Sequence, residues 1–194
     1  MENKRNTNVE VLRLVLMLAI LCWHILVHGY GFKNFGYANM ECLSDEVAII
    51  LASLLAPATY CFMFISGYYG LKFSVKKGIS LELWLILASL LTSFIGSFFF
   101  VKLPIFEFVR ACFPVSTGKW WFMTCYMQIF LLSPILNKGI DNLRKNSFLL
   151  IIVLLVANQI LFFLCLKFLG GNNILGLLTM FLLGRYFNIY KIEI

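Results

Sequence analysis

Long apolar runs without charges recur along most of this chain, and they constrain its fold more than any other feature. A helix needs about 20 apolar residues to cross a bilayer. The candidate spans are residues 9–27, 47–69, 83–101, 120–136, 148–166 and the shorter 174–187. Since a backbone in lipid must satisfy its own hydrogen bonds, these runs predict helices. The sequence therefore predicts an all-α, polytopic integral membrane bundle with about six transmembrane helices.

The charges of the chain are few and are placed between the apolar runs. Charged residues make up 13% of the sequence and hydrophobic residues 61%, whereas soluble domains have about 25% and about 45–50%. The formal net charge of +7 does not indicate nucleic acid, because a nucleic-acid surface clusters Lys and Arg on a soluble face. We therefore expect the lipid bilayer as a partner and no nucleic acid.

The distribution of Lys and Arg predicts an orientation in the membrane. With the amino terminus in the cytoplasm, ten bases lie inside and five outside, leaving aside Arg13 in the first span. The inner bases are Lys4, Arg5, Lys72, Lys76, Lys77, Lys138, Arg144, Lys145, Arg185 and Lys191. Cytoplasmic loops carry the excess of Lys and Arg. We therefore expect cytoplasmic termini, and we place the protein in the plasma (inner) membrane.

One membrane domain over residues 1–194 is the predicted organisation. The first apolar run follows Lys4 and Arg5 as a signal peptide would, but no small-residue cleavage site follows Val27. We therefore expect a retained anchor helix. The stretch 103–113 is too short and too charged to span a membrane. We expect it at the interface or folded back into the protein.

The first span contains the ionisable residues that point most directly to chemistry. Arg13 and His24 are eleven positions apart, so an α-helix places them about 20° apart around its axis and about 16 Å apart along it. Ionisable residues inside a span are costly and indicate function by default. Near the cytoplasmic end Arg13 can hold an anionic group, and deeper in the span His24 can act as general base for a hydroxyl.

Structural roles for the same residues remain open. Arg13 can extend to the lipid headgroups, and His24 can be a hydrogen-bonded histidine inside the bundle. Glu10 has the capping-box spacing with Thr7 and can also pair with Arg13 one turn on. His28 lies one turn beyond His24, but no carboxylate or cysteine completes a site around them. We therefore expect no metal.

Three motifs give the chain a resemblance to a known family. The run EVLRLVLMLAILCWH resembles the opening helix of the acyltransferase-3 family, in which an acidic residue is followed by Arg and, after ten intervening residues, by His. The second span ends in FMFISGYYGLK, which is similar to the family's Ser-Gly-Tyr exit, carried here by Ser66, Gly67 and Tyr68. The run TGKWWFMTCYMQIFLLSPILN resembles the family's Trp-Phe and Tyr-containing helix, which closes with Pro, a hydrophobic residue, Leu and Asn.

The resemblance implies a membrane-bound O-acyltransferase. Such enzymes transfer an acyl group, typically acetyl, from cytoplasmic acyl-CoA to a hydroxyl of a carbohydrate or other envelope molecule. His24 would be the catalytic base or relay, and Arg13 would orient the acyl donor or its phosphates. Acyl-CoA is then a co-substrate, and no permanently bound cofactor is implied. Direct transfer and a covalent acyl-enzyme both fit these residues.

Two departures from the family pattern bear on these assignments. After the second span the family commonly carries Arg, whereas this loop, KFSVKKGIS, has Lys72, Lys76 and Lys77. We assign Lys76 and Lys77 to the phosphates of acyl-CoA, although Lys cannot make the bidentate contacts of Arg. The family's domain has nearly twice as many spans, so we expect this domain to be incomplete at its C-terminus and to need a missing half. A transporter and an inactive half-protein are the alternatives.

Several other residues are assigned structural roles. Pro57 and Pro134 are expected to interrupt helices where neighbouring groups satisfy the freed carbonyls. Polar side chains inside spans are expected to form hydrogen bonds between helices. These side chains are Gln128, Asn158 and Gln159. Cys42 and Cys112 fall in outer loops, where a disulfide and two free thiols are both open.

Overall fold

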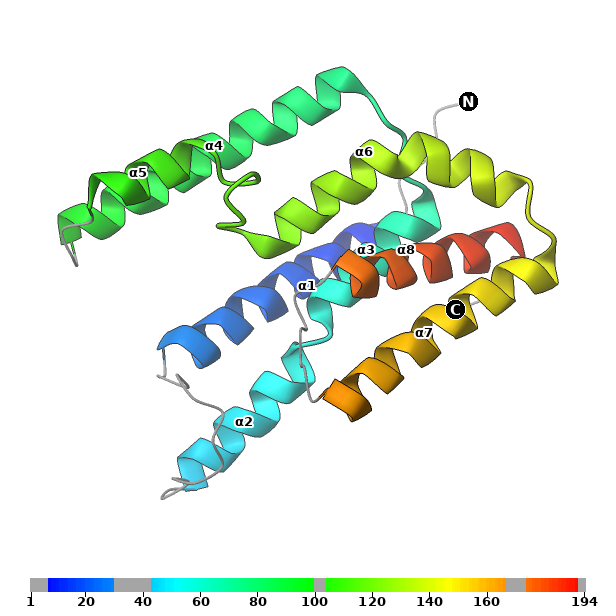
Figure 1. Ribbon diagram of the computed structural model, residues 1–194. Coiled ribbons are helices and arrows are strands. Elements are labelled where there is room, and N and C mark those ends of the chain that lie inside the picture. Colours follow the sequence, from blue (N-terminus) through cyan, green and yellow to red (C-terminus); the bar gives the residue numbers. More distant parts are fainter. Residues whose placement is uncertain (1–6, 30–42, 100–103, 167–173, 192–194) are drawn as a thin grey trace. The chain divides into compact units, whose positions relative to one another are not determined.

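The structure is a computed structural model that describes residues 7–29, 43–99, 104–166 and 174–191, and every regular element within them is a helix (Figure 1). The helices are α1 (Thr7–His24), η1 (Ile25–Gly29), α2 (Leu43–Leu55), α3 (Ala58–Tyr69), α4 (Val75–Phe99), α5 (Ile105–Cys112), α6 (Trp121–Asp141), α7 (Lys145–Leu166) and α8 (Ile174–Ile189). The predicted all-α fold is confirmed. The chain forms two compact units, Met1–Ile65 and Ser66–Ile194, and each is considered by itself.

Three of the six predicted membrane spans are supported by helical segments that are long and apolar enough to cross a membrane. In the described part of the chain, three helical segments are long and apolar enough to cross a membrane: Thr7–Val27, Glu46–Tyr69 and Val75–Phe99. The other three predicted spans fall on α6, α7 and α8. With 16 residues, α8 is about 24 Å long, which is shorter than a hydrocarbon core of about 30 Å. Six spans are therefore not confirmed.

In the first unit, α1 packs on α2 and on α3. Leu16 of α1 forms a buried core with Ala58 and Ile65 of α3, so one stripe of α1 faces its neighbours. Pro57 lies between α2 and α3 and ends the first of them, because proline has no N–H for the helical ladder. The predicted interruption at Pro57 is confirmed.

In the second unit, α8 packs against both α6 and α7. Phe181 of α8 is fully buried, and Phe148 of α7 contacts Tyr186 edge to face with ring centroids 5.5 Å apart. Gln159 of α7 donates a 2.8 Å hydrogen bond to the hydroxyl of Thr179 on α8. The hydrogen bond predicted between helices is confirmed for Gln159.

The other two polar side chains predicted to join helices do not do so. Gln128 and Asn158 are exposed, and neither has an interhelical hydrogen bond to another described residue. Gln128 lies in α6 and Asn158 in α7. For these two side chains the prediction was wrong, because their positions fall on the outer faces of their helices.

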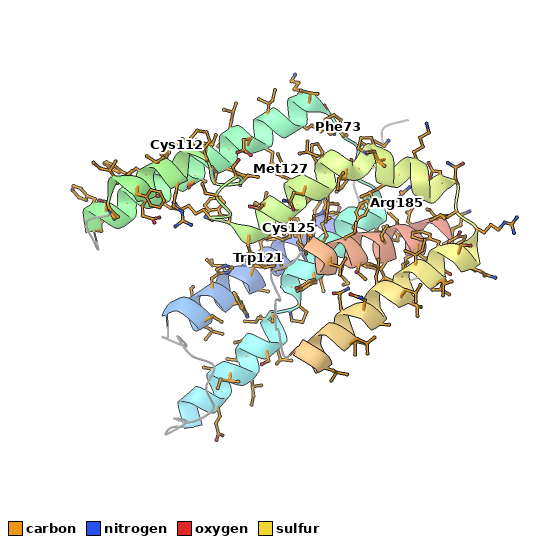
Figure 2. The ribbon with its side chains drawn as sticks, viewed as in Figure 1. Phe73, Cys112, Trp121, Cys125, Met127 and Arg185 are labelled. Atoms are coloured by element: carbon orange, nitrogen blue, oxygen red, sulfur yellow. The ribbon has the colours of Figure 1, made fainter. Side chains whose placement is uncertain are left out.

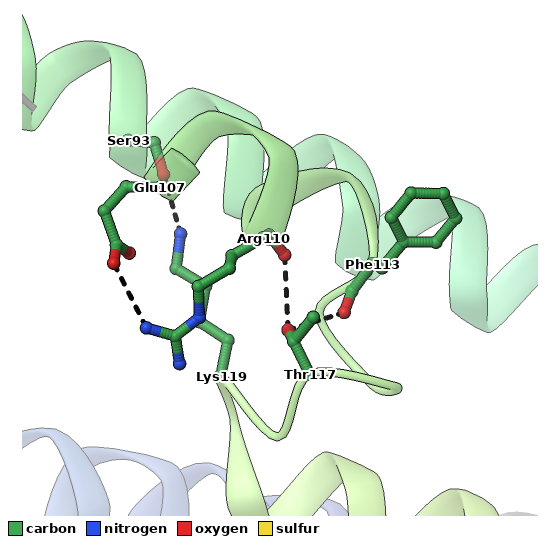
Figure 3. Close-up of polar contacts among 6 residues, drawn as sticks. All are labelled: Ser93, Glu107, Arg110, Phe113, Thr117 and Lys119. Atoms are coloured by element: carbon green, nitrogen blue, oxygen red, sulfur yellow. Dashed lines mark hydrogen bonds and ion pairs between the residues drawn. The ribbon is translucent and has the colours of Figure 1, made fainter. Parts of the chain in front are cut away.

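Within the stretch 103–113, residues Ile105–Cys112 form the short helix α5, which packs along α4. Glu107 and Arg110 form an ion pair at 3.1 Å on α5, while Ile105 and Phe106 are exposed. The turn after α5 is tied to α4, since Lys119 Nζ donates a 2.7 Å hydrogen bond to Ser93 Oγ (Figure 3). This amphipathic helix agrees with the expectation of a segment that does not span. Cys42 lies outside the described residues, so the bridge to Cys112 is not tested.

Two helices differ from their predicted bounds. α4 begins at Val75 rather than near residue 83, so Lys76 and Lys77 lie in its first turn rather than in a loop. α6 runs through Pro134 without a break. Pro134 has no N–H for the carbonyl of Phe130, and Ser133 Oγ donates a 2.7 Å hydrogen bond to that carbonyl instead. The prediction of a break was therefore wrong at Pro134, whereas the predicted satisfaction of the freed carbonyl is confirmed.

Candidate active site

Arg13 and His24 lie on one uninterrupted α-helix, at the edge of its packed face. With the buried Leu16 as the reference, helix geometry places Arg13 about 60° and His24 about 80° to the same side. The Arg13 side chain is 31% exposed, and His24 is exposed. The two side chains therefore share an edge that runs beside the packed stripe of α1, as their spacing predicts.

The Arg13 guanidinium is oriented by an acidic neighbour one turn away. Arg13 Nη1 donates to Glu10 Oε1 at 3.2 Å, and the Glu10 side chain is 48% exposed. The predicted pairing of Glu10 with Arg13 is confirmed. An exposed pair of this kind contributes little to stability. Its consequence is orientation, because the carboxylate restricts the rotamers of a guanidinium that has five N–H donors.

The hydrogen bond of the His24 ring fixes its tautomer. His24 Nδ1 lies 2.8 Å from the carbonyl oxygen of Ile20. A carbonyl only accepts, so Nδ1 carries the proton, and in the neutral ring the lone pair is on Nε2. The Trp23 ring meets the imidazole edge to face at 5.1 Å between centroids. The arrangement gives His24 an oriented basic nitrogen.

The backbone hydrogen-bonding pattern of the helix changes directly after His24. The α-helix ends at His24, and the five residues Ile25–Gly29 form the π-helix η1. Such turns are rare and occur frequently at functional sites. The side chain of His28 is outside the described ones, so the orientation of the second histidine is not tested.

The Ser-Gly-Tyr segment at the end of α3 lies where two helices pack closely, so its role in the structure is packing rather than chemistry. A Cβ atom at Gly67 would lie 2.8 Å from the Cα atom of Phe181 on α8, so only glycine allows the two backbones to meet there. Ser66 is buried beside it. At the end of α3, Gly70 takes a φ of 75°, a conformation that glycine adopts readily.

Lys76 and Lys77 are exposed on the first turn of α4 and belong to the second unit. Arg13 and His24 belong to the first unit. The structure therefore brings Arg13 and His24 onto one edge of α1. A common site for Arg13 with Lys76 and Lys77 stays a prediction.

The motif that ends in Pro, hydrophobic, Leu and Asn has a defined structural role at its last residue. Asn137 Nδ2 donates a 2.9 Å hydrogen bond to the carbonyl of Leu71. Asn137 thus ties the end of α6 to the turn that follows α3. Its Oδ1 atom is buried and has no hydrogen-bond partner among the described residues.

Arg185 is a residue whose environment the sequence analysis missed. Its side chain projects from α8 (Figure 2) and is only 17% exposed, whereas we counted it only among the cytoplasmic bases. The signal was present, because the run FLLGRYF places an arginine within an apolar segment, and ionisable residues there indicate function by default.

A comparison with known proteins shows that one family model matches most of this chain. Residues 6–194 match a family model described as an acyltransferase domain. The search of curated proteins and that of solved structures each gave no match. The matched region contains all three motifs, together with Arg13, His24, Lys76 and Lys77.

Proposed function

We propose that this chain, which belongs to the acyltransferase-3 family of membrane acyltransferases, is an O-acyltransferase that uses acyl-CoA. The acyl group, in the first instance acetyl, would pass to a hydroxyl of a carbohydrate or other envelope molecule. The protein would lie in the plasma (inner) membrane with a cytoplasmic amino terminus. Family membership supports acyl transfer in general and favours it over the transporter alternative.

The observation that carries this proposal is the shared edge of α1. It presents a cation held by Glu10 at one end and an imidazole with its lone pair on Nε2 at the other. The phosphates and the thioester of acyl-CoA are separated by its pantetheine arm. Two groups about 16 Å apart along one helix face can therefore serve the two ends of one donor.

In the proposed reaction, His24 moves one proton twice. Nε2 takes the proton of the acceptor hydroxyl as its oxygen attacks the thioester carbonyl, which forms the new C–O bond. The C–S bond then breaks, and the leaving thiolate takes that proton from the imidazolium. The products are the O-acyl ester and free coenzyme A. A positioned base of this kind contributes about 10²–10⁴ in rate.

Basic side chains would hold the donor. We assign Arg13, Lys76 and Lys77 to the phosphates of acyl-CoA, where lysine acts as a point charge and arginine can form paired hydrogen bonds. In this assignment Glu10 is a positioning residue, because it acts through the guanidinium of Arg13.

The test uses the purified chain in nanodiscs with labelled acetyl-CoA and a mixture of envelope carbohydrates. The variants are His24→Ala and Arg13→Ala, and the matched control is His28→Ala. The chain has two histidines, so the control leaves His24 as the sole imidazole. We expect His24→Ala to lower kcat by about 10²–10⁴ and Arg13→Ala to act mainly on the KM for acetyl-CoA.

The outcomes separate the proposed roles. Equal losses in His24→Ala and His28→Ala would refute His24 as the specific base. A folded wild-type chain that neither binds nor consumes acetyl-CoA would refute the proposed activity for this polypeptide.

A further inference from the structure

We infer that Arg185 and Asn137 form a binding site for a hydroxylated phosphate ester at the basic end of the second unit. This site is separate from the residues that the proposed function assigns to the donor phosphates, and its coenzyme A alternative rests on that proposed function. Three features of the described residues carry this inference: a mostly buried guanidinium without a hydrogen bond, a buried amide oxygen at the same turn, and the basic charge of the surrounding helix ends.

Three helix ends meet at the turn Gly70–Leu71. Asn137 of α6 donates to the Leu71 carbonyl at 2.9 Å. The Nη1 atom of Arg185, on α8, lies 3.0 Å from the position that a Cβ atom of Gly70 would take. Asp141, one turn after Asn137, has its Oδ1 atom 4.0 Å from Arg185 Nη2. Asn137 from α6 and Arg185 from α8 thus both approach the turn Gly70–Leu71.

The Arg185 guanidinium is mostly buried but makes no hydrogen bond with any described residue. Its Nε atom is buried without a partner, and its ion-pair distance to Asp141 exceeds that of a hydrogen bond. The Asp141 side chain is 67% exposed, so this pair neutralises little of the charge. A buried charged donor left without a partner is costly. An anion that accepts from Arg185 would remove that cost.

Asn137 adds a second requirement for the ligand. Its Oδ1 atom is a buried acceptor without a described partner, and it would repel a bare anion. A ligand that carries a phosphate and a nearby hydroxyl satisfies both groups, because the phosphate accepts from Arg185 and the hydroxyl donates to Asn137. Coenzyme A carries such a pair on its ribose phosphate. The headgroup of phosphatidylglycerol carries another.

The surroundings of this turn are strongly basic. Lys145, at the start of α7, lies 5.1 Å from the ring centroid of Tyr190, so the ends of α6, α7 and α8 lie together. Residues 69–78, 137–146 and 184–191 contain eight basic side chains and one acidic side chain, Asp141. The bases are Lys72, Lys76, Lys77, Lys138, Arg144, Lys145, Arg185 and Lys191. Such an end raises the local concentration of anions.

The test measures equilibrium binding of labelled coenzyme A to the full chain in phosphatidylcholine nanodiscs. A parallel arm measures the gain in Tm when phosphatidylglycerol is added to the nanodiscs. The variants are Arg185→Gln and Asp141→Asn. Arg144→Gln is the control, because it removes one exposed charge from the same end. A charged hydrogen bond of about 1.5–3 kcal/mol corresponds to about 10–150-fold in affinity.

Two results support the site and distinguish its ligand. If the ligand is coenzyme A, Arg185→Gln weakens its binding about 10-fold or more, Asp141→Asn strengthens it, and Arg144→Gln changes it less than about 3-fold. If the ligand is the lipid, Arg185→Gln instead abolishes the Tm gain from phosphatidylglycerol and Asp141→Asn increases it.

The inference is overturned if Arg185→Gln acts no more strongly than Arg144→Gln in both arms. It is also overturned if Asp141→Asn weakens both responses, since Arg185 would then serve to pair with Asp141. If Arg185→Gln does not fold, the response of Asp141→Asn decides whether the site exists. Neither readout needs turnover, so failure of the acyl transfer reaction and failure of this site are separate results.

Discussion

Replacing Gly67 by alanine should destabilise the second unit, because the new methyl group would meet the backbone of α8. The Cβ atom would lie 2.8 Å from Phe181 Cα and 2.9 Å from its carbonyl carbon. Backbone atoms cannot turn aside as a side chain can, so the helices must separate. Overpacking costs about 1–3 kcal/mol, and alanine returns about 0.5–1 kcal/mol of helix propensity. We expect a net loss of about 1–2 kcal/mol.

The chain offers a matched control for this substitution. Gly139 also lies in a helix, but nothing lies within 4 Å of its Cβ position. Gly139→Ala should therefore show the propensity gain alone, about 0.5–1 kcal/mol. At about 2–4 °C per kcal/mol for a chain of this size, Gly67→Ala lowers Tm by about 2–8 °C and Gly139→Ala raises it by about 1–4 °C.

The assay is thermal unfolding in detergent micelles, followed by the fluorescence of the four tryptophans. Each variant is compared with wild type at the same detergent concentration. A rise in Tm for Gly67→Ala equal to that for Gly139→Ala would refute the close crossing of α3 and α8. It would also remove the packing explanation of the Ser-Gly-Tyr segment.

Three further predictions concern hydroxyls and an amide in the second unit, and all are measured by chemical denaturation in detergent. Ser133→Ala should cost about 1–2 kcal/mol, since the buried Phe130 carbonyl loses its donor. Ser89→Ala should be neutral or stabilising, because the Ser89 hydroxyl is buried without a described partner; an equal loss in both variants would contradict this reasoning. Gln159→Leu and Thr179→Val should show a coupling of about 0.6 kcal/mol in a double-mutant cycle. Strict additivity would show that the bond contributes nothing.

The helical fold and the geometry of the first span could be predicted from the sequence because both depend on local pattern. An apolar run of sufficient length must be helical in lipid, and a spacing of eleven residues fixes the shared edge of Arg13 and His24 in any α-helix. The pairing of Glu10 with Arg13 follows from the same periodicity. None of these inferences needs to know which helices are neighbours.

The features that the sequence did not reveal depend on contacts between distant segments. Pro134 was expected to break its helix, but Ser133 satisfies the carbonyl that proline frees, and the helix continues. The burial of Arg185 depends on the turn at Gly70 and on the end of α6, which lie far from it in sequence. The start of α4 was placed too late because its first turn carries Lys76 and Lys77, and charges are counted against a span.

The π-helical turn after His24 makes the chain tolerant to a change in length at one place. In η1 each N–H pairs five residues back instead of four, so this segment holds one residue more than an α-helix needs. Deleting one residue within Ile25–Gly29 would restore α-helical pairing and leave Arg13 and His24 in register. The same deletion between Arg13 and His24 would rotate one against the other by about 100°. Insertions and deletions that preserve the shared edge of α1 therefore belong after His24.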